Sequence, residues 1–439
     1  MRKNRTHWVT TGVAAAATLS LAACSAGGSA AGPAADGPVP IEIWGWDPDT
    51  GEQTVEAFNE AQDEVEATYV LQADNIATQT NFRNAFEAGE ELPCLVEGFG
   101  PLTTAVVNGW AQDITDAVTP LEDVFSEGAL ASATVDGRYY GVPTGSDGQF
   151  LIYNERTFEA AGVSVPTTWE EFVEVGRQLR AEGVDMTNLA GEDPTTLINL
   201  SQMAGAEWFT IDGDRWIVNF LGEETLQAAD IIQQLIDDDL VSNQTYQDRP
   251  ALYAHFDSGD MASTPTQWWS LTGLRTNLTE SAGDWVATTI PQFEGADEPV
   301  APGRTEPWFV PVGCENPDAV MAYMAWTASP DGIEAGRNPQ TGAVNFPTQI
   351  ADPAPYVEDI IPEGFFVDDE EAGDVIVEAQ SRVIGKFELG PNYDAWFPEM
   401  QDQWGKAVAG EITVEEALQA VQDFVAADLD AKGIDHTVG

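Results

Sequence analysis

The feature that most constrains this fold is an alternation of short apolar runs with segments of helical periodicity. The alternation starts at Ile41–Trp44, where Ile41 and Ile43 flank an acidic residue, as in a strand with one buried face. The pattern predicts an α/β fold with a parallel sheet and right-handed crossovers. Strands are predicted over 41–44, 67–73 and 92–99, with helices over 51–64, 81–90 and 103–110.

A segment rich in turn residues, 137–154, breaks this rhythm before ending in an apolar strand. Beyond it, two helices separated by a Pro-containing loop are predicted within 157–183. Further helices are predicted over 224–240, 316–329 and 412–432. The last of these carries an apolar stripe that predicts a docking face, formed by Ala417, Leu418, Val421, Phe424 and Val425.

The first residues of the chain predict export. A basic start, a short apolar run and small residues are typical of a secretory signal over 1–23. Leu21-Ala22-Ala23-Cys24 resembles the lipobox of bacterial lipoproteins, which implies lipidation of Cys24 and anchoring to the outer face of the cell membrane. The alternative is a plain signal peptide with an incidental Cys24. Small residues over 24–39 predict a flexible tether.

The formal net charge of −57 excludes several partners. Such a surface repels nucleic acid and anionic lipid headgroups, so we expect no nucleic-acid partner. Because the acids are spread along the chain and hydrophobic residues make up 43%, the charge indicates a solvated surface rather than a disordered tail. Salt adaptation and genome composition both remain open as its cause.

Motifs of enzymes are weak in this sequence. Beyond the signal only His255 and His436 remain, outside any recognised metal-binding pattern, and there is no Walker loop, nucleophile elbow or CxxC. We therefore expect no metal and no cofactor. With 74 acidic residues, a glycosidase-type pair of carboxylates stays open as an alternative.

A set of short motifs, in a fixed order, resembles the extracellular solute-binding proteins of carbohydrate-type ABC importers, such as the maltodextrin-binding proteins. The resemblance covers essentially the whole chain after the signal, with one departure from the usual order at Asp260-Met261-Ala262. The motifs are Gly141-Val142-Pro143, Leu151-Ile152-Tyr153-Asn154, Phe158, Ala161-Gly162, Pro166, Thr168-Trp169-Glu170-Glu171-Phe172, Phe256 through Ala262, Trp268-Trp269, Gly342-Ala343-Val344, and Trp404 through Leu418.

The resemblance implies a two-lobe periplasmic-binding-protein-like fold with the ligand cleft between discontinuous lobes. Lobe one is expected at 40–145 plus 289–333, and lobe two at 146–288 plus 334–439. Two cysteines in an exported chain suggest one disulfide, although two buried free thiols are the alternative. The resemblance places both Cys94 and Cys314 in lobe one, each beside a strand, which favours the bond.

A sugar site explains the candidate residues. Tryptophan and tyrosine offer flat apolar surfaces to a sugar ring, and carboxylates and amides bond its hydroxyls. Trp46 and Asp47 follow the first strand at its carboxyl end, whereas Asp49 is a candidate cap for the next helix. Of the pair Trp268 and Trp269, we expect the first to face the ligand and the second to pack. The full set is Trp46, Asp47, Asn75, Glu97, Phe99, Asp147, Glu192, Asp193, Trp268, Trp269, Arg304, Tyr393 and Trp404.

The sequence therefore predicts a monomeric, lipid-anchored binding protein without catalytic activity. It would capture a sugar or oligosaccharide and deliver it to ABC transporter permease subunits in the membrane. Two alternatives remain at this point. One is a non-sugar ligand such as a polyamine, since an acidic and aromatic cleft also suits cations. The other is a secreted glycan-processing enzyme.

Overall fold

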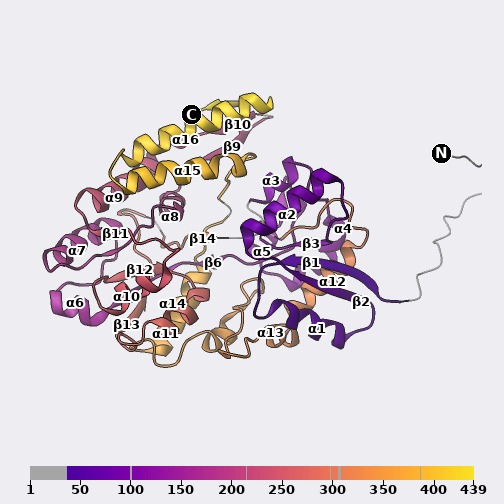
Figure 1. Cartoon of the computed structure of the whole chain (residues 1–439), viewed down its shortest axis with the longest axis horizontal. Helices are drawn as coiled ribbons and strands as arrows, with labels where there is room; N and C mark the ends of the chain where they lie inside the picture. Colours follow the sequence, from indigo (N-terminus) through magenta and orange to yellow (C-terminus); the bar gives the residue numbers. More distant parts are fainter. Residues whose placement is uncertain (1–36, 99–100, 214, 297, 305–307, 386) are drawn as a thin grey trace, which may run out of the picture. The chain divides into compact units, whose positions relative to one another are not determined.

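The structure is a computed structural model that describes residues 37–98, 101–213, 215–296, 298–304, 308–385 and 387–439. Pro38–Gly439 forms one compact unit (Figure 1). The predicted signal peptide and Cys24 lie outside the described residues. Within the described ranges, every helix is too short or too polar to cross a lipid bilayer.

The chain begins with a parallel three-stranded sheet in the order β2-β1-β3, as the alternation predicted. Its strands are β1 (Val39–Gly45), β2 (Val65–Leu71) and β3 (Leu95–Val96). Strand β3 is shorter than predicted because Pro93 has no N–H to donate and Gly98, with a φ of 52°, turns the chain.

Two helices connect these strands. Helix α1 (Gly51–Ala61) buries Val55 and Phe58, in agreement with the predicted helical spacing. Helix α2 (Asn75–Ala88) starts earlier than predicted because Asp74 caps it, with Asp74 Oδ1 accepting a hydrogen bond from Ala77 N at 2.7 Å.

A later segment completes the core around this sheet. The backbones of Val96 and Phe309 exchange two hydrogen bonds, each of 3.1 Å. Helix α12 (Pro317–Thr327) packs Tyr323 edge-on against Phe58 of α1, with ring centroids 5.2 Å apart. The predicted disulfide is confirmed, since Cys94 and Cys314 are bonded with their Cα atoms 5.0 Å apart.

A second sheet is antiparallel and lies in a separate hydrophobic core. Its central strand β7 (Phe150–Asn154) pairs with β12 (Ser263–Thr266) on one side and β13 (Trp285–Thr288) on the other. Phe150, Leu151 and Ile152 are fully buried, which confirms the apolar strand predicted at the end of 137–154.

A third core consists mainly of helices. Its long members are α7 (Trp169–Ala181), α9 (Glu223–Asp237), α15 (Tyr393–Val408) and α16 (Val414–Lys432), and Figure 1 shows α15 and α16 side by side. Helix α16 starts at a capping box. Its predicted stripe is confirmed as a docking face, since four members are buried and Phe424 packs partly buried against the same core.

The chain crosses between these cores at two segments that pair with each other. Strand β6 (Asp147–Gly148) runs antiparallel to β14 (Gly303–Arg304), labelled near the centre of Figure 1. Before β14, Ile290 and Phe293 still pack in the helical core. After it, Val310 packs beside the first sheet. The change from one core to the other therefore falls between Phe293 and Val310.

The remaining helices and strands complete these layers and their connections. They are α3 (Leu102–Val107), α4 (Thr115–Val118), η1 (Thr119–Val124), α5 (Glu127–Ser132), β4 (Thr134–Val135), β5 (Arg138–Tyr139), α6 (Glu155–Ala161), β8 (Thr187–Asn188), α8 (Thr195–Met203), β9 (Phe209–Asp212), β10 (Arg215–Val218), β11 (Val241–Ser242), α10 (Arg249–Asp257), η2 (Trp268–Ser270), α11 (Leu271–Asn277), α13 (Pro330–Ala335), η3 (Ala354–Asp359), α14 (Asp369–Ser381) and β15 (His436–Val438).

Candidate functional site

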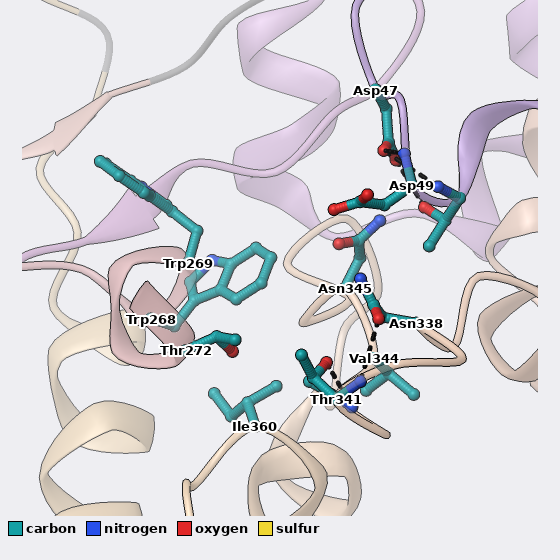
Figure 2. A pocket seen from close by; sticks show the side chains of 12 residues that line it. Asp47, Asp49, Trp268, Trp269, Thr272, Asn338, Thr341, Val344, Asn345 and Ile360 are labelled. Atoms are coloured by element: carbon teal, nitrogen blue, oxygen red, sulfur yellow. Dashed lines mark hydrogen bonds between the residues drawn. The ribbon is translucent and has the colours of Figure 1, made fainter. Parts of the chain in front are cut away.

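Three segments that are distant in sequence surround a pocket of about 190 Å³. We name them the turn wall (46–50, after β1), the tryptophan wall (268–272, η2 and the start of α11) and the amide loop (338–345). Figure 2 shows Asp49 and Asn345 across the pocket from Trp268 and Trp269. The lining residues are Asp47, Asp49, Thr50, Trp268, Trp269, Thr272, Asn338, Thr341, Ala343, Val344, Asn345 and Ile360.

Two polar side chains from the neighbouring strands hold the turn wall. Glu97 Oε2 accepts a hydrogen bond from the N–H of Trp46 at 3.1 Å, and Tyr69 Oη accepts one from the N–H of Asp47 at 2.8 Å. Tyr69 Oη also donates to Glu97 Oε2 at 3.3 Å. A Cβ at Gly45 would lie 2.0 Å from Glu97 Oε2, which explains the glycine where β1 ends.

The tyrosine in this network is held in its protonated form. Burial, together with the negative charge of Glu97, raises the pKa of Tyr69 well above its ordinary value. The phenol therefore keeps the proton that it donates to Glu97. The predicted ligand residue Glu97 supports the turn wall and is not one of the residues that line the pocket.

The two aspartates of the turn wall both line the pocket, but their side chains differ in hydrogen bonding. Asp47 Oδ1 accepts hydrogen bonds from the N–H groups of Asp49 and Thr50 at 2.9 and 3.0 Å, and Asp47 Oδ2 accepts one from Thr50 Oγ1 at 2.5 Å. Asp47 thus fixes the start of α1. Asp49, the candidate cap, has an exposed carboxylate that makes no hydrogen bond or ion pair with the described residues.

Trp46 lies beside the turn and not at the pocket. Its indole covers Gly98 so closely that a Cβ there would lie 1.6 Å from Trp46 Cη2, and the positive φ of Gly98 also favours glycine. The side chain of Trp46 is half-buried. The predicted residue Phe99 lies outside the described residues.

Both members of the tryptophan pair line the pocket, but they differ in exposure and in hydrogen bonding. Trp268 is half-buried, donates from Nε1 to Asp147 Oδ1 at 2.7 Å and packs near Phe346. Trp269 is 54% exposed. Asp147, predicted to face the ligand, anchors Trp268 and does not line the pocket. The member of the pair with an open aromatic surface is therefore Trp269.

The amide loop was missed by the sequence predictions. Asn338 Oδ1 accepts hydrogen bonds from the N–H groups of Gln340 and Thr341 at 2.9 and 3.1 Å, which forms a tight turn. Arg337 Nη1 donates to Gly342 O at 2.5 Å and holds the loop from behind. The signal was present as the turn-forming run NPQTG, but nothing in the sequence placed this turn beside the two walls.

Glu192 and Asp193 make local structural bonds away from this pocket. Glu192 Oε1 accepts from Thr245 Oγ1 at 2.6 Å and from the N–H of Tyr246 at 2.7 Å. Burial alone would raise the pKa of Glu192, but these hydrogen bonds outweigh it and lower the pKa. Asp193 Oδ1 accepts two bonds from Thr195 at the start of α8.

Three other predicted residues are also absent from the described lining of the pocket, and a fourth, Arg304, cannot be placed there or elsewhere. Trp404 is fully buried and donates from Nε1 to a backbone oxygen, so the core already covers both faces of its indole, which argues against ligand contact. Tyr393 stacks on Phe397 with centroids 4.9 Å apart, and Asn75 is the first residue of α2. The backbone of Arg304 pairs with β6, and its side chain lies outside the description.

The described residues contain no group of three or more His, Cys, Asp or Glu side chains arranged to hold a metal ion. What the pocket offers instead is one open indole, one unpaired carboxylate and several amide and hydroxyl groups. These groups can contact an apolar face and bond polar groups around it.

Comparison with known proteins identifies one matching family. The family described as bacterial extracellular solute-binding protein matches residues 53–362, which is more than half of the chain. The match begins inside α1, just after the turn wall, and includes the whole tryptophan wall and the whole amide loop.

Two curated relatives are named for saccharides. The lactose-binding protein of Rhizobium radiobacter is 27% identical over 303 residues, which cover 64% of this chain and 68% of the relative. The arabinooligosaccharide-binding protein of Halalkalibacterium halodurans is 25% identical over 187 residues. That second match spans 41% of either chain.

A solved structure shares the fold. The galacto-N-biose-/lacto-N-biose I-binding protein of an ABC transporter from Bifidobacterium longum, in complex with lacto-N-biose, aligns with a TM-score of 0.77. The alignment covers 91% of this chain and 99% of that one, at 21% identity. It supports the two-lobe binding-protein fold class that the sequence predicted.

Proposed function

This chain belongs to the bacterial extracellular solute-binding protein family, and from that membership we propose that it captures a sugar or oligosaccharide and delivers it to an ABC transporter. A solute-binding protein is not an enzyme, so the glycan-processing alternative falls away. The names of the two curated relatives, which both bind saccharides, support a sugar as the ligand.

The observation that carries this proposal is a pocket lined by two tryptophans, one of them 54% exposed, across from Asp49 and Asn345 (Figure 2). A pyranose has flat apolar C–H faces and a rim of hydroxyls. An open indole can cover one face, because aromatic rings are rigid and lose little conformational entropy on contact. The carboxylate of Asp49 and the amide of Asn345 can then bond the hydroxyl rim.

The size of the pocket limits what it receives. Its volume of about 190 Å³ is below the roughly 300–1,000 Å³ of most small-molecule sites. We therefore propose that it receives one sugar ring and that the rest of an oligosaccharide extends beyond it.

The two predicted lobes remain part of this proposal. Separate hydrophobic cores on the first sheet and on the later sheet and helices support them, as does the pairing of β6 with β14 at the crossings. We place lobe one at 40–145 and from β14 to about residue 328, with lobe two as the remainder. Movement of the lobes about the crossing strands would enclose the sugar and signal occupancy to the permease subunits.

We also propose that Cys24 carries lipid and anchors the monomeric protein to the outer face of the cell membrane. The support is the lipobox-like sequence and the tether that follows it. Replacing Cys24 with Ser should move the protein from the membrane fraction to the medium. If the variant stays with the membrane, the anchor proposal is wrong.

The sugar proposal is tested by thermal-shift screening of the protein against a panel of neutral mono- and oligosaccharides. A sugar that binds only the folded protein should raise the melting temperature by linkage, and its amount should be unchanged afterwards by chromatography. Trp269→Ala should abolish the shift, whereas Trp216→Phe, in β10, should preserve it. Stabilisation by polyamines alone would overturn the assignment of a sugar.

A further inference from the structure

The charged side chains among the described lining residues of the pocket are all negative. Among the described residues, its lining includes the carboxylates of Asp47 and Asp49 and no Lys, Arg or His. The charge of Asp47 is partly balanced by two backbone N–H groups and a hydroxyl. Asp49 has no such compensation from the described residues, so its carboxylate lies at the pocket across from the tryptophan wall (Figure 2).

The basic residue next to the amide loop does not offset this charge. Arg337 directly precedes Asn338, but its guanidinium bonds both carboxylate oxygens of Glu334 at 2.8–3.0 Å and Asp359 at 3.3 Å. Arg337 therefore positions the loop while two carboxylates neutralise its charge. A negatively charged ligand would therefore find no cation to pair with among the described lining residues.

We propose that Asp49 makes the pocket a charge filter, which admits neutral and amine-bearing saccharides and rejects those that carry carboxylate, sulfate or phosphate groups. This inference rests on the proposed sugar-binding function and names the class of sugar. Two like charges a few ångströms apart at a partly exposed site repel strongly enough to weaken binding on the order of ten-fold. An ammonium group would gain attraction from Asp49 and from the face of Trp269.

The charge of the pocket can be measured without any sugar. The chain has 14 tryptophans, so the signal of Trp269 has to be separated from the rest. It is obtained by subtracting the fluorescence of Trp269→Phe from that of the wild type. At equal ionic strength, and with each ion's quenching divided by its quenching of free N-acetyltryptophanamide, caesium should quench this difference signal several-fold more than iodide. Neutral acrylamide corrects for accessibility. Asp49→Asn should lower the caesium-to-iodide ratio for Trp269.

Because the whole protein is acidic, the control is a tryptophan elsewhere. Trp216 in β10 is half-buried, and its signal is isolated in the same way with Trp216→Phe. Asp49→Asn should leave the ratio for Trp216 unchanged. The filter is overturned if iodide quenches Trp269 as well as caesium does, or if Asp49→Asn changes both tryptophans equally.

A second arm uses matched sugars. Methyl galactoside and methyl galacturonide keep the same closed ring and differ only at C6, where a carboxylate replaces the hydroxymethyl group. Calorimetry should show about ten-fold weaker binding of the galacturonide, with the gap narrowed by Asp49→Asn or by 1 M salt. Equal affinity for both would overturn the filter. If no saccharide bound, the proposed function would fail, while the quenching ratios would still decide the charge of the pocket.

Discussion

The turn wall and the tryptophan wall face the same pocket but are stabilised in different ways. The turn wall is held by Glu97 and Tyr69 from the neighbouring strands and by the side chain of Asp47. In the tryptophan wall, Trp268 bonds Asp147 and packs near Phe346, Ser270 bonds Thr266 and Gln267, and Trp269 stays open. The comparison teaches that in each wall one residue of a nearby pair is tied to the scaffold, while the side chain of the other stays open.

The largest expected effect separates the two walls by their tolerance of one added methyl group. Gly45→Ala should lower the free energy of unfolding by about 2–3 kcal/mol, because the new Cβ would lie 2.0 Å from Glu97 Oε2 and displace the network. Gly273→Ala is the matched change at the tryptophan wall, where the nearest atom is Tyr253 Oη at 3.1 Å and the position is helical. It should change stability by less than about 0.5 kcal/mol. Urea denaturation of both variants measures this, and equal losses would contradict the difference between the walls.

The next effect divides the tryptophan pair. Trp269→Ala should weaken binding of a sugar found in the screen by roughly 10- to 100-fold, because the open indole supplies the apolar contact. Its stability should change by less than about 0.5 kcal/mol. Trp268→Ala should lower the free energy of unfolding by about 2 kcal/mol, through lost packing near Phe346 and a lost bond to Asp147. Calorimetry measures the binding and urea denaturation the stability of the same samples. If Trp268→Ala loses only binding and Trp269→Ala loses only stability, the assigned roles are wrong.

A smaller effect divides the aspartates in the same way. Asp47→Ala should lower the free energy of unfolding by about 1 kcal/mol, since three hydrogen bonds at the start of α1 lose their acceptor. Asp49→Ala should leave stability unchanged within about 0.5 kcal/mol, because the carboxylate has no partner to lose among the described residues. Loss of stability in the Asp49 variant alone would restore the sequence prediction that Asp49 caps the helix.

These pairs show how far the sequence predictions reached. Alternation and helical spacing predicted the first sheet and the docking face of α16, because burial repeats with the period of each element. The ordered motifs, and not the periodicity, pointed to the family and to the tryptophan pair. The disulfide between Cys94 and Cys314 was also predicted. Of the two aspartates, Asp47 was predicted for the site and Asp49 for the helix cap.

What the sequence could not predict was how the two members of each pair differ in their contacts. Neighbouring side chains differ in role through contacts with distant residues, such as Asp147 for Trp268, and period-based reasoning does not contain those contacts. The amide loop was missed for the same reason, since Asn338 and Asn345 reach the pocket only through tertiary packing. Trp404 was mistaken for a ligand residue because an aromatic side chain in the core and one in a cleft look alike in sequence.

The smallest expected effect is a difference in alkaline stability, and it tests the buried network of the turn wall. The folded protein raises the pKa of Tyr69 above that of the unfolded chain, near 10. The stabilisation from a protonated phenol is therefore complete below about pH 10 and is lost as the pH rises further, since the unfolded chain releases the proton first. Tyr69→Phe should show a shallower fall in unfolding free energy between pH 10 and 12. The difference in slope should be a fraction of the limiting ~1.4 kcal/mol per pH unit, because solvent screens this partly exposed group.

Tyr246 provides the control for this measurement. Burial raises its pKa to about 12, but it lies apart from the pocket lining. Tyr246→Phe should also flatten the alkaline limb, yet it should leave sugar affinity unchanged at neutral pH. Tyr69→Phe should weaken sugar binding as well, because the N–H of Asp47 loses its acceptor and the turn wall loosens around Asp49. If both variants bind sugar like the wild type, the network stabilises the fold without positioning the pocket, and the contrast between the two walls is one of stability alone.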